Sequence, residues 1–175
     1  MKVKTGLGQD SHKFENNLEK PLILAGVLFP DERGLAANSD GDVIFHALTN
    51  AISSITTVNI LGSEADKLCE KGITDSSVYL KESLKYLKDW KVSHVALSIE
   101  CLTPKINPKI EDMRQCISNY LQISEFDVGI TATSGEGLTE FGKGHGIQCF
   151  DCCDSNLFPR GDYGMVKRKI SRKIW

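Results

Sequence analysis

Short strand-like segments recur along the chain with helical segments between them, and this order constrains the fold more than any other feature. Residues 94–101 alternate in polarity as a strand does, whereas 42–56 and 107–121 carry helix-start signals. There is no internal repeat and no linker rich in proline or glycine, and 175 residues suit one domain. We therefore expect an α+β fold, a single domain with helices packed on one face of a mixed β-sheet.

The other element boundaries follow from the same patterns. We predict strands at 2–10, 128–134 and 146–152, a strand or hairpin arm at 21–30, a helix at 76–90 and an irregular loop at 57–75. The domain is expected to cover residues 1–155. A basic C-terminal tail is expected at 156–175, because six lysines and arginines stand against one aspartate from residue 160 onward.

Charge and hydropathy exclude several classes of protein. A net charge of −2 gives no global argument for nucleic-acid binding, and no apolar run is long enough to span a bilayer. The N-terminus has no signal-peptide core, so we expect a cytoplasmic protein whose six cysteines stay reduced. The C-x-x-C spacing of Cys149 and Cys152 has no second pair, and we interpret these thiols as buried and structural.

Asp10, His12 and His46 form a candidate metal site. Side chains two apart on a strand point to the same face, so Asp10 and His12 can meet one target. His46 comes from the predicted helix at 42–56. Two imidazoles and one carboxylate suit catalytic zinc, with a fourth position open for substrate. The alternative is a solvated Asp-x-His pair and a hydrogen-bonded core histidine.

The start of that helix is a candidate anion site. Ser39 and Asp42 match a capping box, and free amides at a helix N-terminus favour phosphate. Asp42 also lies four residues before His46 and can share its face. The alternative role of Ser39 is a simple helix cap.

A third candidate follows the apolar strand at 128–134. Thr133 and Ser134 supply hydroxyls before glycine-flanked amides that can hold a phosphate. Glu136 can hold a hard cation such as Mg²⁺, and Lys143 can close over the anion. A glycine-rich hairpin turn is the alternative. Together the three candidates favour phosphoryl or diphosphate chemistry over peptide hydrolysis.

These segments resemble the 2-C-methyl-D-erythritol 2,4-cyclodiphosphate synthase family. Residues 34–49 are similar to its signature S-D-G-D-x-x-x-H-A, here Ser39-Asp40-Gly41-Asp42-Val43-Ile44-Phe45-His46-Ala47. Further matching blocks lie at 8–14, 104–108, 133–136 and 142–146, in the order of the family. The resemblance covers residues 2 to about 153.

The resemblance implies a bacterial lyase of non-mevalonate isoprenoid biosynthesis, a homotrimer with active sites between subunits. It implies Zn²⁺, or another divalent transition metal, at Asp10, His12 and His46. Mg²⁺ or Mn²⁺ would be held by Glu136 and the substrate diphosphate. The substrate would be 4-diphosphocytidyl-2-C-methyl-D-erythritol 2-phosphate, converted to the 2,4-cyclodiphosphate with release of CMP.

Site residues carried over by the resemblance fall into two groups. The catalytic ones are Asn38, Ser134 and Glu136. The substrate-binding ones are Asp10, Ser11, His12, Asn38, Ser39, Cys101, Lys105, Ile106, Asn107, Thr133, Ser134, Glu136 and Lys143. Neither nucleic acid nor a membrane is an expected partner.

Several positions depart from the family pattern and suggest a divergent member. Asn38 stands where the family has histidine, so it can donate a hydrogen bond but carries no proton for acid catalysis. Ser134 replaces a threonine, and Lys143 replaces an arginine with its bidentate fork. Residues 59–62 align with G-D-I-G, and residues 63–67 replace the F-P-D-T-D-P that follows.

Three other hypotheses remain at this point. A zinc-dependent phosphohydrolase would use the same ligands with water as the nucleophile. A catalytically impaired trimer would keep the metal site as a binding or scaffold protein. A core without any metal would explain the histidines by packing alone.

Overall fold

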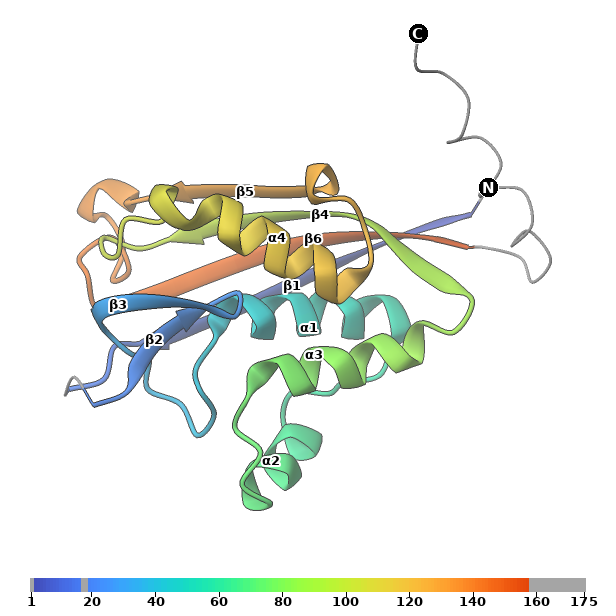
Figure 1. The fold of residues 1–175 in the computed structure, drawn as a ribbon, viewed down its shortest axis with the longest axis horizontal. Helices are drawn as coiled ribbons and strands as arrows, with labels where there is room; N and C mark the ends of the chain where they lie inside the picture. Colours follow the sequence, from blue (N-terminus) through green and yellow to red (C-terminus); the bar gives the residue numbers. More distant parts are fainter. Residues whose placement is uncertain (1, 17–18, 158–175) are drawn as a thin grey trace, which may run out of the picture.

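In a computed structural model of the chain, which describes residues 2–16 and 19–157, a four-stranded mixed sheet carries helices on one face (Figure 1). The strand order is β1-β6-β4-β5, with β1 at Val3–Lys13, β4 at Trp90–Glu100, β5 at Val128–Thr133 and β6 at Gly146–Leu157. The β4–β5 pair is parallel and the other two pairs are antiparallel. The predicted α+β class is confirmed.

Within residues 2–16 and 19–157 a hairpin and four α-helices complete the fold. The hairpin joins β2 (Pro21–Leu24) to β3 (Val27–Arg33). The helices are α1 (Val43–Thr56), α2 (Ser63–Glu70), α3 (Ser76–Leu84) and α4 (Ile110–Leu121). Figure 1 shows α1 running along β1, with α3 beside α1 and α4 across the other half of the sheet. One apolar core joins α1 and α4 to the inner side chains of the strands.

Two glycines let α1 approach β1 closely. A Cβ atom at Gly8 would overlap the carbonyl oxygen of Ala47, and a Cβ at Gly6 would overlap that of Ala51. Strand alternation puts Asp10 and His12 on the same inner face as these glycines. The glycines therefore bring the N-terminal half of α1, with His46, against the end of β1.

Several predicted boundaries are wrong. The segment 57–75 is not irregular throughout, because α2 forms within it and packs Ala65 against Ile60 and Tyr79. The helix predicted at 76–90 ends at Leu84 and is followed by a short 3-10 turn. Lys88 adopts a left-handed φ of 55°, which reverses the chain, and β4 then begins at Trp90.

The ends of β1 and β6 also differ from the prediction. β1 continues past residue 10 to Lys13, and β6 continues past residue 152 to Leu157, because the two pair in register along their whole length. Asn156 and Leu157 of the predicted tail thus belong to β6. Residues 158–175 lie outside the described residues.

The face of the sheet opposite the helices carries apolar side chains exposed in the single chain. Leu7 is 66% exposed and Phe150 is 45% exposed. Ala96 is exposed on the same face, where it pairs with Cys152. Cys149 and Cys153 are buried on the inner face of β6, whereas Cys152 is only half-buried on the opposite face, so the prediction that it is buried is wrong. All six cysteines are free. Within residues 2–16 and 19–157 no helix has the length and hydropathy needed to cross a bilayer.

Candidate metal centre and substrate site

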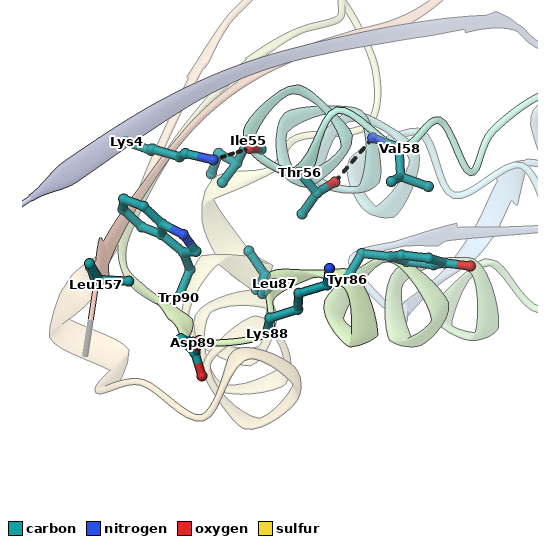
Figure 2. A pocket seen from close by; sticks show the side chains of 10 residues that line it. All are labelled: Lys4, Ile55, Thr56, Val58, Tyr86, Leu87, Lys88, Asp89, Trp90 and Leu157. Atoms are coloured by element: carbon teal, nitrogen blue, oxygen red, sulfur yellow. Dashed lines mark hydrogen bonds between the residues drawn. The ribbon is translucent and has the colours of Figure 1, made fainter. Parts of the chain in front are cut away.

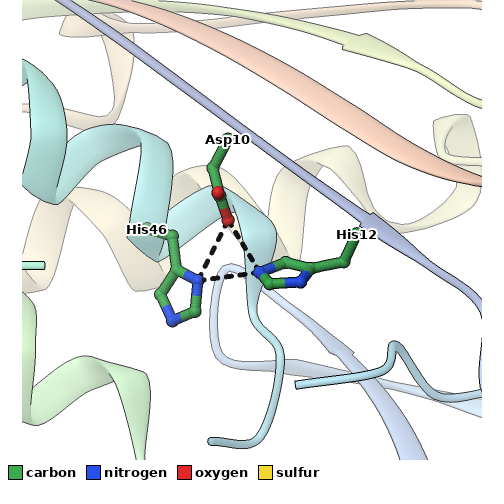
Figure 3. Close-up of side chains that lie close together, drawn as sticks. All are labelled: Asp10, His12 and His46. Atoms are coloured by element: carbon green, nitrogen blue, oxygen red, sulfur yellow. Dashed lines mark hydrogen bonds and ion pairs between the residues drawn. The ribbon is translucent and has the colours of Figure 1, made fainter. Parts of the chain in front are cut away.

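Asp10, His12 and His46 converge at the end of β1 and the first turns of α1 (Figure 3). Asp10 Oδ2 lies 2.9 Å from His12 Nε2 and 3.0 Å from His46 Nδ1. The two ring nitrogens are 3.2 Å apart. Among the described residues this is the one group of three or more such donors close enough to hold a metal ion.

The other nitrogen of each ring is hydrogen-bonded to the protein. His12 Nδ1 lies 3.1 Å from the carbonyl oxygen of Ala36, which can only accept, so Nδ1 carries the proton. His46 Nε2 lies 2.9 Å from Ser76 Oγ. Metal-binding histidines are typically held in this way. The donor set, its spacing and these bonds all fit a divalent metal ion.

Electrostatics at the centre favour an ionised carboxylate. Burial of Asp10 opposes ionisation, but hydrogen bonds from His12 and His46 outweigh it and lower the pKa of Asp10 to about 2. The hydrogen bond to Asp10 raises the pKa of His12, against the opposing effect of its burial. A cation placed among the three groups would take over the neutralising role of these protons.

The metal ligands line a cavity of about 200 Å³. Asn38 and Ser39, which the sequence analysis assigns to substrate binding, line it as well, and that role remains a prediction. Its other wall was missed, because the segment that forms α2 was predicted to be irregular. That wall is made by Leu61, Gly62, Ala65, Asp66, Cys69 and Tyr79.

The predicted capping box is wrong. The N-cap of α1 is Asp42, whose fully buried carboxylate accepts from the amides of Ile44 and Phe45. It also accepts from the amides of Ala25 and Gly26 in the hairpin. Asp42 therefore fixes the hairpin to α1, and the amides of Ile44 and Phe45 are not free for a phosphate.

A second cavity, of about 460 Å³, gathers most of the other predicted substrate-binding residues. The loop after β4 and the end of β5 form its walls. The predicted residues that line it are Cys101, Lys105, Ile106, Asn107, Thr133 and Ser134. Cys101 is buried, and this burial raises the pKa of its thiol to about 11, so it acts as a neutral wall.

Three predicted residues lie outside both cavities. Ser11 points to the opposite face of β1 from Asp10 and His12. Glu136 is exposed after the end of β5, with a left-handed φ of 49°. Lys143 is exposed and donates to Glu140 at 2.8 Å. Their roles in substrate binding remain predictions.

The two cavities belong to opposite edges of the sheet. β1 carries the metal ligands at one edge, and β5 leads to Thr133, Ser134 and Glu136 at the other. Three strand spacings separate the edges, or about 14 Å. One chain therefore does not bring the metal centre and Glu136 together.

A third cavity, of about 290 Å³, lies at the far end of α1 (Figure 2). Lys4 reaches across it to the carbonyl oxygen of Ile55 at 2.9 Å, with its Nζ 4.8 Å from the centre of the Trp90 ring. Lys4 and His12 are eight residues apart on β1, or about 26 Å. This cavity holds none of the predicted site residues.

The fold and the centre define a class: α+β proteins whose helix-covered mixed sheet carries an Asp-His-His metal site. Within that class the chain belongs to the YgbB family, whose model matches residues 3–154.

A named relative supports this assignment. A 2-C-methyl-D-erythritol 2,4-cyclodiphosphate synthase of Chlamydia felis is 56% identical over 150 residues, covering 84% of this chain and 85% of the relative. The family predicted from the sequence is confirmed. At this identity the chain is not a divergent member, which corrects the expectation drawn from the replaced residues.

Solved structures show the same fold. A 2C-methyl-D-erythritol-2,4-cyclodiphosphate synthase solved with CDP bound matches with a TM-score of 0.76 and 26% identity, over 87% of this chain and 100% of that one. The bifunctional IspDF of Campylobacter jejuni matches with a TM-score of 0.81 and 28% identity. It covers 90% of this chain, which spans only 43% of that longer protein.

Proposed function

We propose that the chain is a 2-C-methyl-D-erythritol 2,4-cyclodiphosphate synthase. Its substrate is 4-diphosphocytidyl-2-C-methyl-D-erythritol 2-phosphate. An oxygen of the 2-phosphate attacks the β-phosphorus, the bond from that phosphorus to the α-phosphate oxygen breaks, and CMP leaves. The observation that carries the proposal is the Asp10-His12-His46 centre in a chain 56% identical to a relative of that name.

Attack within one molecule is mainly a problem of positioning. The cavity at Asn38 and Ser39 is suited to hold the phosphorylated end of the substrate beside the metal ligands. Ser134 and the Lys105 ammonium suit the diphosphate and nucleotide end, in the larger cavity. Asn38 acts as a hydrogen-bond donor and not as an acid. Holding both ends aligns the attacking oxygen with the leaving group.

Asp10, His12 and His46 would hold Zn²⁺ or a similar transition metal, and Glu136 would hold Mg²⁺ or Mn²⁺ together with the diphosphate. Divalent ions so placed neutralise the repulsion between phosphoryl groups. The ligand types assign a different metal to each site, because imidazole favours zinc whereas a single exposed carboxylate favours a hard cation.

The active enzyme is proposed to be a homotrimer whose sites lie between neighbouring subunits. The separation of the metal centre from Glu136 by the width of the sheet supports this, since a neighbour can supply the missing half. The exposed apolar face around Leu7 and Phe150 supports it as well. Sedimentation equilibrium tests the assembly, and a monomer that turns over substrate would contradict it. The cytoplasmic location stays a prediction.

Release of CMP from the cytidylyl substrate, with Mg²⁺ present, tests the activity. We expect turnover that a strong chelator abolishes and that zinc with magnesium restores. His46→Ala should lose zinc and turnover but keep its circular dichroism spectrum. Asp112→Ala removes an exposed group on α4 and should match the wild type. Turnover in the His46 variant equal to wild type would reject the role of the triad.

A further inference from the structure

A chain of hydrogen bonds leads from the metal ligand His46 to two side chains that no metal ion would touch. Ser76 is fully buried at the first position of α3, and its Oγ lies 2.9 Å from His46 Nε2. The same Oγ is hydrogen-bonded to Asp40 Oδ1. Asp40 belongs to the turn before α1, so the three residues come from three separate segments.

The direction of each bond follows from what each group can donate. An Asp40 carboxylate has no proton, so the single hydroxyl proton of Ser76 goes to Asp40. Ser76 Oγ can then only accept from His46, which requires the proton of the ring to sit on Nε2. Nδ1, which lies 3.0 Å from Asp10 in the metal-free chain, is then the nitrogen that binds a metal ion when the ion takes the place of the proton between the ring and Asp10.

Backbone amides hold Asp40 in place to receive the hydroxyl proton. Its Oδ2 accepts from the amide of Ser76 at 3.0 Å, and its Oδ1 accepts from the amide of Asp42 at 3.1 Å. The amide of Asp40 donates to the carbonyl oxygen of Thr74 at 2.7 Å. The turn before α1 and the start of α3 are thus joined by several bonds around one serine.

We infer that Ser76 and Asp40 are positioning residues that fix the tautomer and ring orientation of His46 for binding a divalent metal. The inference rests on the proposed metal centre. His12 achieves the same end through the backbone of Ala36, which mutation of a side chain leaves intact. Of the two rings, the outer nitrogen of His46 is the one held by a side chain, that of Ser76. Ser39 Oγ is a more distant neighbour of His46 Nε2, at 3.3 Å.

Zinc affinity tests the inference without reference to turnover. Metal-free protein competes with a chromophoric chelator for Zn²⁺, and the dissociation constant is compared among variants. Removing such a partner of a metal-bound histidine typically weakens metal binding about 10–100-fold. We expect a weakening of that order for Ser76→Ala. Asp40→Asn should also weaken binding. The amide and the hydroxyl of Ser76 each donate to one carboxylate oxygen of Asp40, and asparagine keeps only one of these two acceptors.

Ser77 provides a matched control on the same turn of α3. It is 4% exposed, and its Oγ has no hydrogen-bond partner within the part of the chain that the structure describes. Ser77→Ala therefore removes a buried hydroxyl of the same kind that does not face His46, and its zinc affinity should equal that of the wild type. Circular dichroism checks that each variant is folded.

A second readout is the long-range proton–nitrogen NMR spectrum of the zinc-loaded protein, where the His46 proton is expected on Nε2. If zinc affinity is unchanged in both Ser76→Ala and Asp40→Asn, the inference is overturned but the proposed metal centre is not. An equal loss in Ser77→Ala, or a proton on Nδ1, would overturn it as well. Wild-type protein that binds no divalent ion would overturn the proposed metal centre, and the inference with it.

Discussion

Asp151 provides the sharpest test of the energetics of this fold. Its side chain is fully buried on the inner face of β6, between Cys149 and Cys153, and both carboxyl oxygens are without a hydrogen-bond partner among the described residues. Burial raises the pKa of this carboxyl from 3.8 to about 8. At neutral pH the folded chain therefore holds a proton here that the unfolded chain releases.

The sign and size of the effect follow from this difference. Because the unfolded chain binds fewer protons between pH 4 and 8, raising the pH over this range lowers the free energy of unfolding. Each pH unit changes it by about 1.4 kcal/mol. At pH 7 the ionisation of Asp151 in the unfolded chain therefore lowers the free energy of unfolding by about 4 kcal/mol, compared with a side chain of the same shape that does not titrate.

Asp151→Asn is the perturbation that isolates this contribution. The amide keeps the shape but adds donors without partners, which costs about 1–3 kcal/mol at every pH. The variant should therefore gain stability relative to wild type as the pH rises, by about 3 kcal/mol from pH 5 to pH 7.5. Urea unfolding at several pH values and one protein concentration measures this difference.

Asp154→Asn is the control for Asp151→Asn. Asp154 lies on the other face of the same strand, where its carboxylate accepts from Thr5 at 2.6 Å. Asp154→Asn should change the free energy of unfolding by less than about 1 kcal/mol. A difference between Asp151→Asn and wild type that stays constant with pH would refute the argument, since it would mean that Asp151 does not titrate on unfolding.

Three further predictions concern packing and the two ends of the substrate. Gly8→Ala should lower the free energy of unfolding by about 2 kcal/mol or more, because the added Cβ meets the backbone of α1. Gly129→Ala gains only ordinary contacts and should be nearly neutral in urea unfolding. Equal losses of stability in the two variants would contradict the close packing of α1 on β1. Glu136→Gln should raise the Mg²⁺ concentration for half-maximal turnover and leave the zinc content unchanged, and a fall in zinc would show that the two metals are wrongly assigned. Lys143→Ala should raise KM several-fold, because a contact to the substrate anion is lost. Lys85→Ala is the control, since it also removes an exposed lysine paired with a glutamate three residues away, and it should leave KM unchanged. Unchanged kinetics in both variants would count against the role of Lys143.

The sequence predicts the metal centre well because its signals are local. Asp10 and His12 share a strand face, and His46 follows the helix-start signal of the helix predicted at 42–56. The class of fold was predictable for the same reason, since alternation and helix-start signals depend on neighbouring residues.

The sequence does not predict what depends on distant partners. α2 has only eight residues and packs Ala65 against Ile60 and Tyr79, and a helix this short depends on such tertiary packing. Asp42 becomes the cap of α1 because the hairpin amides of Ala25 and Gly26 also require an acceptor. Ser76 lies 30 residues from His46, and no spacing rule joins a serine to a histidine over that distance.

The most direct test of the central claim is the phosphorus NMR spectrum of the products formed from the cytidylyl substrate with zinc and Mg²⁺. The proposed function predicts equal amounts of CMP and a cyclic diphosphate. A linear phosphate product would point instead to a zinc-dependent phosphohydrolase. Unchanged substrate in the presence of metal-loaded protein would contradict catalysis altogether.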